Sequence, residues 1–198
     1  NAAVVGEREF VHSQEENMVF VSINEGIGCG IIFQGQLYSG SSGNAGEYGH
    51  IIIENKGRPC HCGNRGCWET LASTAFMQRR YREIADKKEI TLSQIKKALG
   101  KGNKKKETQD LLTEVAYNIG LGLVNIINSL SPELIVIGGD MLEFKKYIEG
   151  EMRGVIKDKD LNISYQRLQV KFSKMGGLAV VHGLACHVFN EIISLIKH

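Results

Sequence analysis

The sequence predicts an α/β fold, in which one mixed sheet carries helices on both of its faces. In the second half of the chain, apolar runs of strand length alternate with longer segments of helical periodicity, a pattern typical of an α/β sheet. In the first half, short apolar runs are separated by glycine-containing turns, which is typical of antiparallel hairpins. Apolar residues make up 42 % of the 198 residues, so one sizeable core is expected.

The first half begins with a helix expected over 1–15 and continues with short strands. The runs 19–23 and 30–33 are apolar, and Gly26-Ile27-Gly28 between them predicts a tight hairpin turn whose backbone a ligand can approach closely. A second turn is expected at 34–36, because glycine stands between two glutamines there. Three consecutive isoleucines predict a further strand over 51–53.

Helices dominate the middle of the chain. One is expected over 68–85, directly after a cysteine-rich loop, and another over 92–99 with Thr91 as its cap. The lysine-rich stretch 101–106 is interpreted as a solvated loop rather than a phosphate or nucleic-acid patch. Apolar residues at helical spacing then predict the longest helix, over 107–130.

Glycine lowers the stability of a helix, so glycines inside this longest helix predict close packing against a neighbouring element. They are Gly120 and Gly122. Beyond Pro132, the expected elements alternate between strand and helix. In chain order they are a buried strand at 134–137, a helix at 142–156, a strand at 168–172 and a final helix at 178–196.

Composition narrows the class of protein. The net charge of +2 gives no strong attraction to nucleic acid or membrane, and no run of 18 apolar residues predicts a transmembrane helix. Five cysteines, three of them clustered, favour a metal in a reducing compartment over a disulfide framework, so we expect a cytoplasmic protein. The start lacks both methionine and a basic signal region, which suggests a fragment of a longer protein.

The most informative motif is Cys60-x-Cys62-x4-Cys67, with His50 ten residues before it. Four soft or borderline ligands suit one tetrahedral zinc, and a complete protein ligand set leaves no position for catalytic water. The pattern therefore predicts a structural zinc that holds a loop in place. A reduced, metal-free loop is the alternative. His61 is a rival to His50, although its place between two ligand cysteines turns its side chain away from their shared metal.

Several motifs together resemble the ROK family of sugar kinases and sugar-responsive repressors, and the resemblance covers essentially the whole chain. They are Glu47-x-Gly49-His50, the run Cys60-x-Cys62-Gly63-x-x-Gly66-Cys67-x-Glu69, the start Asn1-Ala2-Ala3 with Gly6-Glu7, and the strand with its turn from Leu134 to Gly139. The resemblance implies an actin/hexokinase-like (ribonuclease H-like) ATPase-superfamily fold with a zinc-bound loop. It also implies the zinc ligands His50, Cys60, Cys62 and Cys67.

The same resemblance implies a monosaccharide site beside the metal. Glu47 and Glu69 are its expected sugar contacts, because ionised carboxylates accept paired hydrogen bonds from neighbouring hydroxyls. His50 is expected to touch a hydroxyl through its second ring nitrogen, and Asn44 is a further candidate. The alternatives are ordinary exposed glutamates, a first-turn helix charge at Glu69 and a turn residue at Asn44.

One residue departs from the pattern of the family's kinases. Glu25 stands where those kinases carry the threonine of a Gly-Thr-Gly phosphate turn, and a carboxylate there repels phosphate oxygens. The resemblance leaves open whether the parent protein is an enzyme, but Glu25 favours a regulator. If the parent protein were an ATP-dependent sugar kinase that uses magnesium, four glycines would be expected to contact the nucleotide. They are Gly26, Gly28, Gly138 and Gly139.

The sequence is therefore interpreted as the C-terminal half, over 1–198, of a ROK-type sugar-sensing or kinase-like region, with a zinc loop at 50–67. The preferred function is the sugar-binding effector domain of a transcriptional regulator that resembles the xylose-repressor branch. DNA would be bound by a domain outside this chain, no membrane is involved, and a homodimer or higher oligomer is expected. The alternative is the C-terminal domain of a ROK sugar kinase that phosphorylates a hexose.

Overall fold

The computed structural model describes residues 1–12, 14–100, 104–159 and 168–196. The strands are β1 (Met18–Ile23), β2 (Ile27–Phe33), β3 (Gln36–Leu37), β4 (Leu134–Gly138) and β5 (Gln169–Phe172). The α-helices are α1 (Ala2–Val11), α2 (Glu69–Ala72), α3 (Thr74–Ala85), α4 (Leu92–Gly100), α5 (Lys105–Leu130), α6 (Lys145–Lys159) and α7 (Leu178–Ile196), with 3-10 turns η1 (Tyr48–His50) and η2 (Asp140–Phe144).

The strands form one mixed sheet in the order β3-β2-β1-β4-β5. The hairpins β1–β2 and β2–β3 are antiparallel, whereas β4 pairs in parallel with both β1 and β5. Side chains alternate between the faces of a strand, and the two cores follow this rule. Val19 and Val21 belong to the larger core, whereas Met18 and Phe20 belong to the smaller one. The predicted mixed sheet is confirmed.

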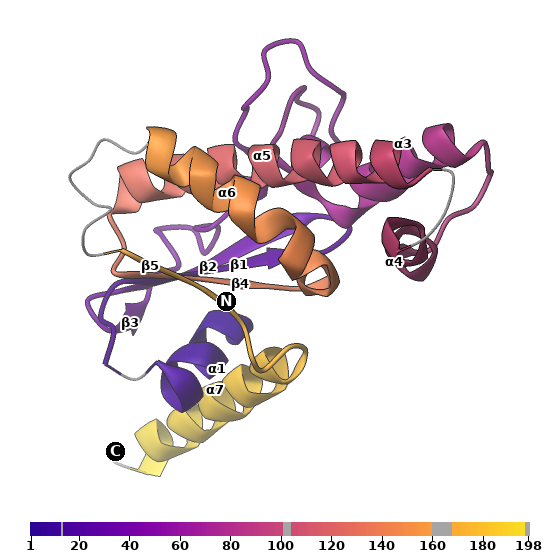
Figure 1. Cartoon of the computed structure of the whole chain (residues 1–198). Coiled ribbons are helices and arrows are strands. Elements are labelled where there is room, and N and C mark those ends of the chain that lie inside the picture. Colours follow the sequence, from indigo (N-terminus) through magenta and orange to yellow (C-terminus); the bar gives the residue numbers. More distant parts are fainter. Residues whose placement is uncertain (13, 101–103, 160–167, 197–198) are drawn as a thin grey trace.

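Helices α1 and α7 lie together on one face of the sheet, as Figure 1 shows. Two glycines let these helices cross at backbone contact. A Cβ on Gly6 would lie 2.1 Å from the carbonyl oxygen of Ala179, and a Cβ on Gly183 would lie 1.7 Å from that of Ala2. No side chain fits at either position, so the two helices are held as a closely packed pair.

The opposite face is covered by α5 and α6, with α3 and α4 beyond them (Figure 1). The predicted close packing of the glycines in α5 is confirmed, because a Cβ on Gly120 would lie 2.7 Å from Val155 of α6 and one on Gly122 would lie 1.9 Å from the Trp68 ring. Among the described helices only α5 is long and apolar enough to cross a membrane. Most of its apolar window is buried inside the protein, which marks it as a core helix.

The first hairpin and the isoleucine run differ from the sequence prediction. The turn comprises Asn24, Glu25 and Gly26, and Gly28 lies inside β2 opposite Ser22, because the ladder already closes at the Ile23–Ile27 pair. The expected strand 51–53 is only an isolated bridge between Ile52 and Cys67. Among the described residues only the short segment 66–68 pairs with it, because the chain turns away at once into the cysteine loop.

The predicted helices also need corrections. The helix expected over 1–15 spans only Ala2–Val11, and His12 ends it. The helix expected over 68–85 is broken into α2 and α3 at Ser73, which is extended and accepts a hydrogen bond from the Phe76 amide as an N-cap. Within the lysine stretch, residues 101–103 lie outside the described part, and α5 already begins at Lys105. The helix expected from 142 begins as the 3-10 turn η2. The predicted Thr91 cap of α4 is confirmed by a Gln94 amide 3.3 Å from its hydroxyl.

Candidate functional site

The cysteine loop is fixed at both ends by backbone contacts. The amide of Trp68 donates to the carbonyl of Ile51 at 2.8 Å, and the amide of Ile53 donates to the carbonyl of Gly66 at 2.9 Å. Gly66 has φ +72°, and a Cβ there would lie 1.8 Å from the carbonyl oxygen of Glu54, so only glycine fits this crossing. Trp68 is fully buried and donates through Nε1 to the Asn118 carbonyl of α5 at 2.8 Å, which anchors the loop to the core.

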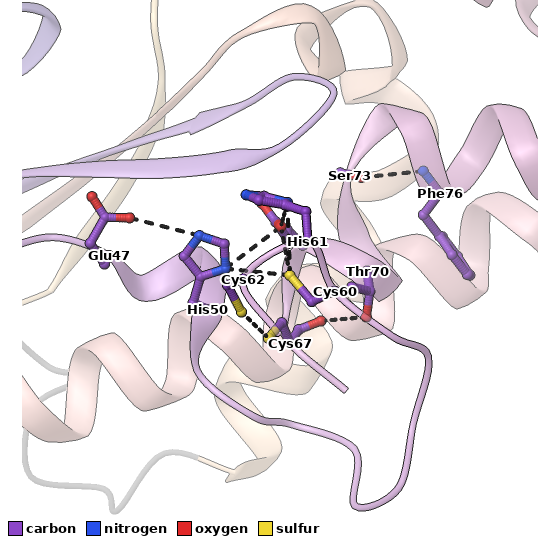
Figure 2. A network of polar contacts seen from close by, with 10 residues as sticks. Glu47, His50, Cys60, His61, Cys62, Cys67, Thr70, Ser73 and Phe76 are labelled. Atoms are coloured by element: carbon purple, nitrogen blue, oxygen red, sulfur yellow. Dashed lines mark hydrogen bonds and ion pairs between the residues drawn. The ribbon is translucent and has the colours of Figure 1, made fainter. Parts of the chain in front are cut away.

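The loop brings one histidine and three cysteines together. The ligand atoms of His50, Cys60, Cys62 and Cys67 all lie within 4.8 Å of one another. Nδ1 of His50 is 3.5 Å from Sγ of Cys60, and the sulfurs of Cys62 and Cys67 are 3.6 Å apart. Figure 2 shows His50 facing the cysteines across the loop. The predicted set of four therefore exists as one cluster in space.

This cluster fits a tetrahedral metal. Sulfurs bound to one zinc at about 2.3 Å are separated by about 3.8 Å, close to the observed spacing. Desolvation raises the pKa of the Cys60 thiol to about 12 and also raises that of Cys67, whereas a hydrogen bond from the Asn64 main chain lowers the pKa of Cys62. Three thiolates this close repel one another, and a bound divalent cation removes that repulsion.

Glu69 is turned toward the metal cluster. It is 8 % exposed, and its Oε1 accepts from the Cys60 thiol at 3.0 Å and lies 3.6 Å from Nδ1 of His50. The same oxygen lies 3.1 Å from Nδ1 of His61. His61 is largely exposed, but its side chain does not turn away from the cluster as predicted, because its Nδ1 lies 3.9 Å from Sγ of Cys60 and faces Glu69. His50, His61 and Glu69 thus form a second group with metal-ligand spacing, which shares His50 with the first.

Glu47 lies on the other side of His50. Its Oε2 is 3.9 Å from Nε2 of His50, so the imidazole stands between this carboxylate and the cysteines (Figure 2). Glu47 lines a cavity of about 380 Å³ together with Asn1, Ser22 and Gly28. Glu69 lines a different cavity, of about 180 Å³, and Asn44 is exposed and lines neither. The structure therefore places the two predicted sugar carboxylates on opposite sides of His50.

Asn24 is a structural residue that the sequence prediction missed. Its Oδ1 accepts from the Asp140 amide at 2.8 Å, its carbonyl accepts from the Thr74 amide at 2.8 Å, and its Nδ2 donates to Ser22 at 2.9 Å. The only sequence signal was an asparagine at the start of a turn, which favours hydrogen bonds to nearby backbone.

This residue joins the two glycine turns predicted to meet a nucleotide. Asn24 and Gly26 follow β1, and Gly138 and Gly139 end β4, so both turns lie at the carboxyl ends of neighbouring parallel strands. Gly139 has φ +89°, and a Cβ there would lie 2.7 Å from Oδ1 of Asn24. Gly28 is displaced into β2, where it lines the same cavity as Glu47.

Comparison with known proteins decides the family. A model described as the ROK family matches residues 1–187. The chain belongs to the ROK family. It is 30 % identical over 204 residues to a xylose repressor of Bacillus subtilis, an alignment that covers 99 % of this chain and 50 % of the repressor.

Solved ROK structures share the fold. A ROK family transcriptional regulator described as a homolog of the Escherichia coli MLC protein superposes with a TM-score of 0.80 at 30 % identity, and the match covers 92 % of this chain and 48 % of that one. A ROK hexokinase from Thermus thermophilus superposes with a TM-score of 0.83 at 22 % identity, covering 97 % of this chain and 64 % of that one. The predicted actin/hexokinase-like fold is therefore confirmed, and this ROK chain spans about half the length of the repressors that it matches.

Proposed function

We propose that this chain is the C-terminal half of the sugar-sensing region of a ROK transcriptional regulator, with a structural zinc in the loop 50–67. The single observation that carries the proposal is the position of His50. One ring nitrogen faces the cysteine cluster, and the other faces Glu47 at the edge of a cavity. His50 thus links the metal site to Glu47, and Glu47 in turn lines the cavity.

A zinc bound by His50 and the three cysteines would cross-link the loop and neutralise its thiolates. Two carboxylates of the chain flank the cluster. The Glu47 carboxylate lies 3.9 Å from Nε2 of His50, so its charge favours a proton on Nε2, which would leave Nδ1 free as a ligand. A carboxylate behind a ligand histidine also helps to orient its ring. Cys60 would give up its thiol proton to bind zinc, so the contact of Glu69 that would remain is to Nδ1 of His61 at 3.1 Å. The carboxylate at the cavity is thereby held in place before a ligand arrives.

The cavity beside Glu47 has properties that suit a monosaccharide. Its volume of about 380 Å³ lies in the range of small-molecule sites. Glycines of β2 and of the 43–46 loop line it, so a ligand meets backbone groups directly, and Glu47 supplies an acceptor for hydroxyls. We propose Glu47 and His50 as the central sugar contacts, with Glu69 and Asn44 as further contacts that need local movement to reach the ligand.

Glu25 supports a regulator over a kinase. It is exposed at the tip of the β1–β2 turn, beside the turn that ends β4, where a kinase of this fold needs room for nucleotide phosphates. The xylose repressor and the MLC homolog are both regulators by name, which agrees with this choice. In the proposed mechanism, sugar binding shifts a conformational equilibrium of this region. The shift changes how DNA-binding domains outside this chain are arranged in a dimer or higher oligomer.

The proposal is tested by calorimetric titration of the native, full-length protein with a panel of monosaccharides. One sugar should bind, and Glu47→Gln should weaken it at least about 10-fold, the loss of roughly one charge-assisted hydrogen bond. Glu54→Gln is the matched control. Glu54 is also an exposed carboxylate of this part of the chain, but it lines a different cavity. Equal weakening by both variants would remove Glu47 from the site.

A kinase is the second candidate, because the hexokinase shares the fold and the two glycine turns meet at Asn24. Incubation of the same protein with magnesium, ATP and the sugar that binds should yield no phosphorylated sugar. Detectable, sugar-dependent phosphate transfer would replace the regulator proposal with the kinase.

A further inference from the structure

A second polar cavity, of about 700 Å³, lies at the edge of the sheet and shares no lining residue with the cavity beside Glu47. Three segments far apart in the sequence form it: the end of α1 with the residues after it, α6 from Lys145 to Arg153, and β5 with Lys174 just beyond it. Its volume lies within the range of small-molecule sites. It has no part in the proposed sugar site.

Cations outnumber anions around this cavity. Lys145, Arg153, Lys171 and Lys174 line it, against the carboxylates of Glu15 and Glu149 only. Both carboxylates are already engaged, since Glu149 holds Arg153 at 2.9 Å and Glu15 lies 4.0 Å from the Nζ of Lys171.

Two of these lysines lack a carboxylate partner among the described residues. The ammonium of Lys145 lies 4.7 Å from the centre of the Phe172 ring, and Lys174 is exposed without an ion pair. The two ammonium groups therefore leave uncompensated positive charge on one cavity, which favours an anion.

The backbone of β5 adds donors to the same cavity. The amides of Gln169 and Ser173 donate to β4, so the alternate residues Val170 and Phe172 present their main-chain groups to the open edge of the sheet. The Val170 carbonyl is taken by Arg153 at 2.8 Å. The amides of Val170 and Phe172 and the carbonyl of Phe172 remain at this edge, and the Lys145 ammonium lies over the Phe172 ring.

We propose that this cavity binds a small dianionic ligand of the phosphate-monoester class, with Lys145 and Lys174 as its principal contacts. Lysine ammonium groups bind phosphate oxygens as mobile point charges, and a main-chain amide adds a directed donor. The partly buried Phe172 ring offers an apolar surface for the organic part of such a ligand.

The contact made by Arg153 argues against an extended peptide as the ligand. A peptide that joins β5 as a new strand needs both the donors and the acceptors of the edge. Arg153, itself held by Glu149, already occupies the Val170 carbonyl, so the ladder is blocked at its middle.

The test is calorimetric titration of the native protein with inorganic phosphate at constant ionic strength, with chloride as the reference salt. Phosphate should bind, and the double variant Lys145→Ala with Lys174→Ala should weaken it at least about 10-fold. The matched control is Lys146→Ala with Lys157→Ala, which removes the same charge from exposed lysines of α6 that do not line the cavity. The control should bind within about twofold of the parent, because the charge that it loses is exposed to solvent outside the cavity and is screened by salt.

The outcomes separate the possibilities. Selective loss in the first double variant supports the site, provided that both variants melt as the parent does in chloride. Equal loss in the two double variants would show nonspecific charge attraction and overturn the proposal. So would an absence of phosphate binding, or binding of a hexaglutamate peptide without any response to phosphate. Monosaccharide binding should be unchanged in the first double variant, so failure here is distinguishable from failure of the proposed sugar site.

Discussion

Replacing Gly122 by alanine should destabilise the protein, although alanine is the better helix former. A Cβ at this position of α5 would lie 1.9 Å from a ring carbon of Trp68 and within 2.3 Å of two more. Trp68 is fully buried and tied to the Asn118 carbonyl, so the ring has no free space into which to move. Because Trp68 follows Cys67 directly, any shift of the ring also disturbs the metal loop.

The expected magnitude follows from two opposing contributions. Forcing a methyl group into a packed core costs about 1–3 kcal/mol, and expulsion of the tryptophan would cost more. Helix propensity returns up to about 1 kcal/mol. Because the buried ring cannot move aside, the cost lies at the upper end of this range, and the net loss is about 2 kcal/mol. For a chain of this length that lowers the melting temperature by roughly 4–8 °C.

Thermal melting and urea unfolding of Gly122→Ala should be compared with Gly154→Ala. Gly154 lies in α6 with nothing within 4 Å of an added Cβ, so the same substitution should stabilise the protein there by up to about 1 kcal/mol. Chelator competition should also show weaker metal retention in Gly122→Ala. If both variants were stabilised to the same degree, the argument from Trp68 packing would be wrong.

Three further outcomes are expected. Gly183→Val should cost about 2–3 kcal/mol in urea unfolding and speed hydrogen exchange in α7, because its Cβ would lie 1.7 Å from a carbonyl oxygen of α1; unchanged exchange would contradict the close crossing. Desolvation, and then the charge of Lys171, lowers the pKa of His12 in the folded protein from 6.5. As the pH falls, His12 is therefore protonated in the unfolded chain before it is protonated in the folded one. Stability should therefore fall as pH drops below 6.5, and less steeply in His12→Gln when urea unfolding is followed between pH 7 and 5. On the proposed zinc assignment, Cys62→Ser should abolish the fall in melting temperature that a chelator causes, whereas Cys186→Ser should retain it.

The regular elements were predictable wherever periodicity alone decides the structure. The final helix was expected over 178–196 and is observed as Leu178–Ile196, because two glycines mark its start and a long apolar stretch with helical spacing follows them. Prediction failed where a tertiary contact or a cap decides. Ser73 breaks a continuous helical pattern because its hydroxyl caps the next helix. The run 51–53 has strand composition but no second strand beside it.

The site was predictable to the extent that its residues are local in sequence. The spacing from His50 to Cys67 placed four ligands in one loop, and the structure brings them within 4.8 Å. Side-chain direction was not predictable, because Glu69 turns to Cys60 rather than to the cavity of Glu47. The role of Asn24 was hidden for another reason. It depends on a backbone amide 116 residues away, which no local pattern records.

The short span of the metal loop has a consequence for the order of folding. The pairing of β1 with β4 joins Met18 to Leu134, whereas all four ligands lie between His50 and Cys67. The entropic cost of closing a loop grows with its length, so the ligand loop closes at lower cost than the central strand pair. On the proposed zinc assignment, we expect metal capture to precede completion of the sheet, and zinc added before refolding should then speed the formation of native fluorescence from Trp68. An unchanged rate would place metal binding after the sheet.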